Sequence, residues 1–75
     1  MNQIFNPQRM EIARMRRMVS RRDLARRIGV RPCKLARWRH ELSEPTAEQV
    51  EDIATALDWP EGFFYGEDID LPTLP

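Results

Sequence analysis

The sequence is poor in the residues on which several classes of protein depend. Its single cysteine cannot form an internal disulfide, which excludes the small secreted proteins that such bridges hold together. No apolar run approaches the ~18 residues of a membrane span, and the opening residues MNQIFNPQRM lack the apolar core of a signal peptide. One histidine and no glycine-rich phosphate loop leave neither a nucleophile–base pair nor a metal cage. We therefore predict a cytoplasmic protein that is not an enzyme, uses no cofactor or metal and does not contact a membrane.

Length and composition indicate one small folded unit. The 75 residues are 41% hydrophobic and 32% charged, a balance that is typical of globular domains. We expect the compact domain to span residues 1–66. The stretch EDIDLPTLP, residues 67–75, is acidic and contains two prolines, so we expect an irregular tail there.

The charges cancel in total but are separated along the chain. Residues 1–40 hold all twelve basic residues and two acidic ones, a net charge of +10. Residues 41–75 hold ten acidic residues and no basic ones, a net charge of −10. Such asymmetry is typical of a nucleic-acid surface joined to an acidic segment. The alternative is two halves that attract each other while the arginines simply face solvent.

Start and stop signals divide the first half into short helices, and strand patterns are lacking. Asn6 before Pro7 is typical of a helix start, and we expect that helix to reach about Met18. Ser20 caps a second helix. Gly29 ends it, because glycine accepts the left-handed conformation that terminates a helix.

Further signals of the same kind follow. Pro32 opens a third helix, which we expect to run to about His40. Thr46 caps a fourth, whose apolar positions repeat at the spacing of a buried helical face. That helix ends before Pro60, which starts a last short turn. The predicted fold is all-α, a compact bundle of about five short helices.

The second and third helices form the pattern of a helix-turn-helix. A turn that contains Gly29 joins them, and the third helix has a thin apolar face, Leu35 and Trp38. Its other positions are small, polar or basic, as a helix that enters the major groove of DNA requires. The preceding helix of such a pair supplies donors to phosphates.

With these elements in order, the chain resembles the phage-repressor (Cro-like, XRE) helix-turn-helix domains of bacteria and their phages. The resemblance covers about residues 7–65 and is carried, in order and spacing, by Val19-Ser20, Asp23-Leu24-Ala25, Ile28-Gly29-Val30, Leu35, Arg37-Trp38, Glu44-Pro45-Thr46, Ile53-Ala54 and Ala56-Leu57. The closing FFYGED and Leu-Pro tail also look like the helix-turn-helix part that precedes a metallopeptidase domain in some regulators. The resemblance implies a sequence-specific regulator of transcription, a repressor that occludes a promoter.

The resemblance also implies which residues contact duplex DNA. Arg21 stands where the family has a phosphate-binding glutamine, and Arg37 lies on the outward face of the third helix, where its two-pronged donor group suits guanine. Cys33 is small enough to contact a thymine methyl group; a redox sensor is the alternative for this thiol. The predicted DNA-binding residues are Arg21, Arg22, Arg31, Pro32, Cys33, Lys34, Arg37 and Arg39.

Two positions depart from the family pattern. The family commonly pairs an arginine at the place of Arg14 with a glutamate where this chain has Arg39, so that salt bridge is missing. Either Glu11 or Glu41 compensates, or Arg39 turns toward phosphate. Glu41 also replaces the glycine that usually ends the third helix. Because a left-handed glutamate is costly, we expect a different exit from that helix.

The C-terminal aromatic residues are more than a small core can bury. We expect one or two to complete the core and the cluster to form a homodimer contact, which would set two third helices one DNA turn apart. The predicted interface residues are Trp59, Phe63, Phe64 and Tyr65.

Other readings of the chain stay open at this point. An antitoxin-like module would bind a partner protein through its acidic, aromatic C-terminal part. Single-stranded RNA binding would require exposed aromatic residues among the arginines. The acidic residues 67–70 either face away from the phosphates or fold over the basic face and compete with DNA.

Overall fold

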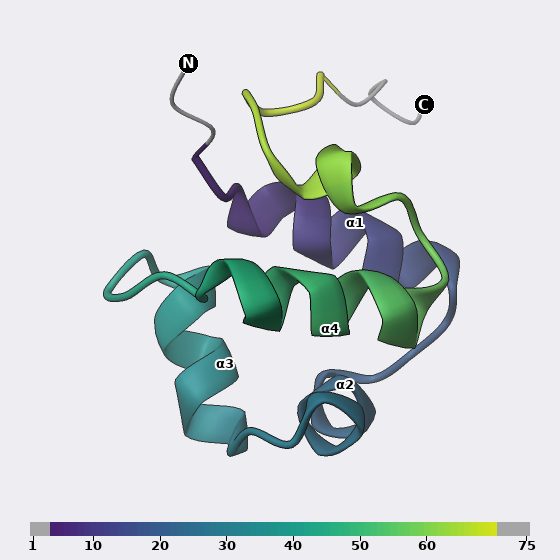
Figure 1. The fold of residues 1–75 in the computed structure, drawn as a ribbon, viewed down its shortest axis with the longest axis vertical. Coiled ribbons are helices and arrows are strands. Elements are labelled where there is room, and N and C mark those ends of the chain that lie inside the picture. Colours follow the sequence, from purple (N-terminus) through teal and green to yellow (C-terminus); the bar gives the residue numbers. More distant parts are fainter. Residues whose placement is uncertain (1–3, 71–75) are drawn as a thin grey trace, which may run out of the picture.

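The computed structural model describes residues 4–70 and contains four α-helices and a short 3₁₀ turn. In chain order they are α1 (Pro7–Arg16), α2 (Arg21–Ile28), α3 (Pro32–Arg39), α4 (Ala47–Leu57) and η1 (Glu61–Phe64). In Figure 1, α4 runs through the middle of the molecule, with α2 and α3 on one side and η1 on the other. The all-α prediction is confirmed. None of the helices in the described residues has the length and apolar character to cross a membrane.

The first helix begins where the sequence predicts and ends earlier. The Asn6 side chain accepts a hydrogen bond from the backbone N–H of Gln8 at 2.9 Å. The helix ends at Arg16 and not at Met18, which adopts a left-handed φ of 56° and is 93% exposed. The chain turns there because Val19 must enter the core. Arg14 Nη1 donates a hydrogen bond to the Val19 carbonyl oxygen at 2.8 Å.

The helix-turn-helix pair forms through the predicted caps. Ser20 Oγ accepts from the backbone N–H of Asp23 at 3.0 Å, and Gly29 ends α2 with a φ of 73°. We expected the chain to leave the third helix without the usual left-handed residue, because Glu41 replaces glycine there, and this expectation is wrong. Glu41 takes a left-handed φ of 59° without being glycine, at a cost of roughly 1–2 kcal/mol.

The fourth helix carries a complete capping box at its start. Thr46 Oγ1 accepts from the backbone N–H of Gln49 at 3.1 Å, and Gln49 Oε1 accepts from that of Thr46 at 2.8 Å. The helix ends at Leu57, before Asp58 takes a left-handed φ of 50°. The start of α4 is thus set by side chains within its own first turn.

The core gathers one apolar face from each helix. Its most deeply buried large side chains are Trp38, Phe64, Met10, Leu24, Leu35, Ile53, Leu57 and Val50. The apolar faces predicted for the third and fourth helices are therefore buried. η1 closes the core by inserting Phe64 against α1 and α4.

The first described residues and the last lie side by side. The backbone N–H of Asn6 donates to Phe64 O at 2.8 Å, and that of Gly66 donates to Ile4 O at 3.2 Å. Residues 67–70 adopt neither helix nor strand, and Gln8 and Ile69 bond reciprocally at 2.7 and 3.0 Å. The described part of the acidic stretch thus lies against α1. The rest of the predicted tail, 71–75, lies outside the described residues.

Candidate nucleic-acid interface

The third helix presents basic side chains to solvent because its two apolar side chains turn inward. Leu35 and Trp38 are each 1% exposed and pack into the core. Cys33 and Arg37, four residues apart and on one face of the helix, are both exposed. Lys34 is exposed beside them. The outward face of α3 therefore combines a small side chain with two long cationic ones.

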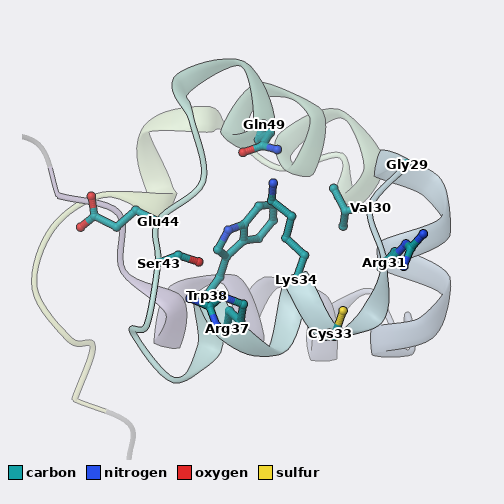
Figure 2. Close-up of a pocket in the computed structure, with 10 residues that line it drawn as sticks. All are labelled: Gly29, Val30, Arg31, Cys33, Lys34, Arg37, Trp38, Ser43, Glu44 and Gln49. Atoms are coloured by element: carbon teal, nitrogen blue, oxygen red, sulfur yellow. The ribbon is translucent and has the colours of Figure 1, made fainter.

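These side chains border a groove of about 670 Å³ between α3, the loop after it and α4. Figure 2 shows Val30 at one end of this groove and Ser43 and Glu44 at the other, with Gln49 of α4 facing α3. Lys34 extends from α3 toward Gln49. We call this surface the recognition groove.

Six of the ten residues that line the recognition groove are not among the predicted DNA-binding residues: Gly29, Val30, Trp38, Ser43, Glu44 and Gln49. Three of them, Ser43, Glu44 and Gln49, come from the loop after α3 and from α4, outside the helix that was predicted to contact DNA bases. The capping pattern at Thr46 and Gln49 marks where α4 starts, but no local signal says that this start lies beside α3. Packing alone brings the two together.

One wall of the recognition groove contains a buried polar group without a partner. The indole Nε1 of Trp38 is covered and makes no hydrogen bond with the described residues. Leaving a buried N–H unpaired costs about 1–3 kcal/mol, so such groups are few in folded proteins. The groove therefore includes a donor for which residues 4–70 supply no acceptor.

Two of the predicted DNA-binding residues lie at a different place. Arg21 and Arg39 line a second cavity of about 310 Å³, which also includes Glu11, Glu41 and Asp68. Arg22 and Pro32, also predicted to contact DNA, are exposed and line neither hollow. The structure thus brings Arg31, Cys33, Lys34 and Arg37 together and sets Arg21 and Arg39 apart from them.

Glu11 takes the place of the missing family salt bridge, one of the two compensations that we considered. Its carboxylate lies 3.0 Å from Arg14 Nε and 2.7 Å from Arg21 Nη2. Partial burial raises the pKa of the Glu11 carboxyl, but the hydrogen bonds and charges of Arg14 and Arg21 outweigh it, so the pKa lies below its ordinary value. Arg39 forms no ion pair with residues 4–70, and its Nε is buried there without a hydrogen bond.

The fold itself uses half of the basic residues. Arg17 donates to the carbonyls of Leu57 and Asp58 at 2.8 and 2.7 Å, and Arg27 donates to that of Ala56 at 3.2 Å. These cations complement the negative C-terminal end of α4. The residues held in this way or in ion pairs are Arg9, Arg14, Arg17, Arg21, Arg26 and Arg27.

The other basic residues make no hydrogen bond or ion pair with residues 4–70. They are Arg16, Arg22, Arg31, Lys34, Arg37 and Arg39. Five of the six are exposed, and four belong to α3 or its N-cap. The free positive charge therefore gathers around α3, which the total of +10 for the first half does not reveal.

The aromatic residues near the C-terminus divide between core and surface. Phe64 is 0% exposed and packs against α1 and α4, which corrects its predicted place at an interface to one in the core. Trp59, Phe63 and Tyr65 pack against the core and stay partly exposed. The guanidinium groups of Arg9 and Arg17 lie over the rings of Phe63 and Trp59, at 5.4 and 4.9 Å from the ring centres.

No metal cage is found within residues 4–70, where no three His, Cys, Asp or Glu side chains are grouped to hold an ion. Cys33 is a free, exposed thiol on the groove side of α3. The recognition groove offers the cations of Lys34 and Arg37 and the hydrogen-bonding groups of Ser43 and Gln49.

Comparison with known proteins agrees with this geometry. A family model described as the Cro/C1-type HTH DNA-binding domain matches residues 10–62, which run from α1 into η1. Searches of curated proteins and of solved structures found no match.

Proposed function

The chain belongs to the Cro/C1-type helix-turn-helix DNA-binding domains, and from that premise we propose that it is a sequence-specific repressor that sets α3 in the major groove of duplex DNA. The observation that carries the proposal is the group of exposed cations on α3 and its N-cap, Arg31, Lys34 and Arg37, which have no partner in the described chain. Cations that are kept out of internal ion pairs are available to a polyanion.

In this proposal the cations have two kinds of role. Arg37 reads a base, because its guanidinium can donate two hydrogen bonds to guanine O6 and N7. Cys33, one turn earlier on the same face, contacts a thymine methyl group. Arg21 holds a phosphate at the start of α2, since its side chain remains 52% exposed while it binds Glu11. Repression follows when the bound domain occludes a promoter.

We also propose that two copies bind together. The partly exposed aromatic side chains Trp59, Phe63 and Tyr65 form the contact, while Phe64 supports it from the core. If the α3 helices of the two copies lie about 34 Å apart, they meet half-sites that are one turn of the DNA duplex apart. A regulator of this kind works where the DNA is, and we place it in the cytoplasm.

The proposal is tested by measuring the affinity for labelled duplexes over a series of salt concentrations. Four to six phosphate contacts per chain predict a slope of roughly −4 to −5 for log K against log salt. Selection from randomised duplexes should return one enriched half-site. Failure to bind any duplex at low ionic strength, or tight binding to a protein partner with only secondary DNA affinity, would overturn the proposal in favour of the interaction-module reading.

A further inference from the structure

The buried N–H of Trp38 needs an acceptor that the described chain lacks. An indole nitrogen can only donate, so its partner must be an oxygen or another acceptor from outside. Trp38 is 1% exposed and its Nε1 is unpartnered, while its ring lines the recognition groove. In Figure 2 the indole nitrogen faces the side of the groove on which Ser43 lies.

The rest of the groove indicates what kind of acceptor fits. Lys34 and Arg37 bring two positive charges to its α3 side. Ser43 and Gln49 add neutral polar groups, and Glu44 at the end of the groove is the one acidic residue that lines it. Cations beside a neutral donor suit an anionic oxygen, and backbone phosphates are the most numerous such oxygens on a nucleic acid.

We propose that the indole N–H of Trp38 donates a hydrogen bond to a backbone phosphate oxygen of the DNA strand that runs along the recognition groove. This inference rests on the proposed function, because α3 must lie in the major groove for a strand to pass there. The nitrogen is covered in the free chain, so this bond requires the side chains of the loop between α3 and α4 to move aside. Trp38 is thus a phosphate-positioning residue as well as a core residue.

A bound water is the competing partner. A small cavity of about 80 Å³ lies against Trp38 on the side of Ile4 and Phe5, and it is large enough for one or two waters. A water there would satisfy the donor without DNA. The two partners predict different behaviour of the same proton when duplex is added.

The test follows the indole N–H groups by ¹H–¹⁵N NMR of the wild-type chain. The sequence holds two tryptophans, so the resonance that disappears in Trp38→Phe identifies Trp38. On titration with duplex DNA, the Trp38 proton should shift downfield and exchange more slowly with solvent. An unchanged Trp38 resonance while the duplex binds would overturn the inference and favour the water.

Two further measurements complete the test. One distinguishes a DNA phosphate from free phosphate, and the other distinguishes a failure of this inference from a failure of the proposed function. Inorganic phosphate at the same ionic strength should leave the Trp38 resonance in place; an equal shift would overturn the assignment to the nucleic-acid backbone. Trp38→Phe should bind duplexes about fivefold more weakly, by the same factor on every sequence, because a phosphate contact carries no sequence information. If wild type binds no duplex, the proposed function fails; if Trp38→Phe binds as tightly as wild type, this inference alone fails.

Discussion

Glu11 Oε2 lies 3.0 Å from Arg14 Nε, so an acid one turn earlier on α1 neutralises this arginine. In the family, the arginine at this place commonly pairs with a glutamate at the place of Arg39. This pairing of Arg14 with Glu11 affects the charge on the surface near the end of α3. Arg39 makes no hydrogen bond or ion pair in the described chain. One more cation therefore remains near the end of α3.

This arrangement predicts that Glu11→Gln destabilises the domain. The loss of the carboxylate leaves Arg14 partly buried without its acid, and we expect the free energy of unfolding to fall by about 1–2 kcal/mol at pH 7. Since the folded pKa of Glu11 lies below the ordinary 4.5, its contribution is complete above about pH 4.5 and is lost as the pH falls through the folded pKa. Urea unfolding of both proteins from pH 7 to pH 3 measures the difference, which should shrink toward zero at the acid end.

The control is Asp23→Asn, which removes a pair of the same spacing on the surface. Asp23 and Arg26 are 45% and 76% exposed, so their pair should contribute less than ~0.5 kcal/mol. Equal losses for the two variants, or a Glu11 effect that does not depend on pH, would contradict the ion-pair account.

Arg17→Ala should weaken folding and leave DNA binding intact. The variant loses two hydrogen bonds to the end of α4 and the contact with the Trp59 ring, a loss of about 1–2 kcal/mol in stability. Thermal unfolding and duplex affinity are measured on the same samples. Arg16→Ala is the matched control, because Arg16 is exposed and has no partner in the described chain. A folded Arg17→Ala that loses DNA affinity while Arg16→Ala does not would assign Arg17 to the interface.

Arg37→Ala and Arg21→Ala should affect binding in different ways. Arg37 reads a base in our proposal, so its loss should cost about 1–3 kcal/mol on the preferred site and relax the preference at one base pair. Arg21 holds a phosphate, so its loss should weaken all sequences alike. Binding to an array of randomised duplexes distinguishes the two. An equal loss on every duplex for Arg37→Ala would refute its role in reading a base.

Phe64→Ala should unfold much of the protein. Truncation of a fully buried phenylalanine costs about 3–5 kcal/mol, and a domain of this size has roughly 3–5 kcal/mol of stability. Circular dichroism should therefore show a large loss of helix at 25 °C. A cooperative transition close to that of wild type would show that η1 is not needed to close the core.

Phe63→Ala tests the dimer at a neighbouring position of the same turn. Phe63 is partly exposed, so the variant should remain folded. If this surface joins two copies, sedimentation should show the wild type as a dimer and the variant shifted toward monomer at the same concentration. A wild type that stays monomeric at high protein concentration would remove the proposed interface.

The order and the ends of the helices follow from local chemistry, and the sequence determined most of them. A cap bonds to a residue two or three positions away, as at Asn6, Ser20 and Thr46, so its partner can be read from the chain itself. Two expectations were wrong, the end of the first helix and the exit from the third, and at both places tertiary packing decides the backbone conformation. Met18 leaves the helix so that Val19 can be buried, and Glu41 takes a strained conformation that its own type disfavours.

The tertiary structure alone decided which cations are free and what surrounds them. Arg17 and Arg27 meet carbonyls that lie 40 and 29 positions further along the chain, so no local pattern could separate them from Lys34 or Arg37. The same holds for Gln49, which becomes part of the recognition groove only because α4 packs beside α3. Charge counts depend on composition, whereas the availability of a charge depends on the atoms that folding brings within hydrogen-bond distance.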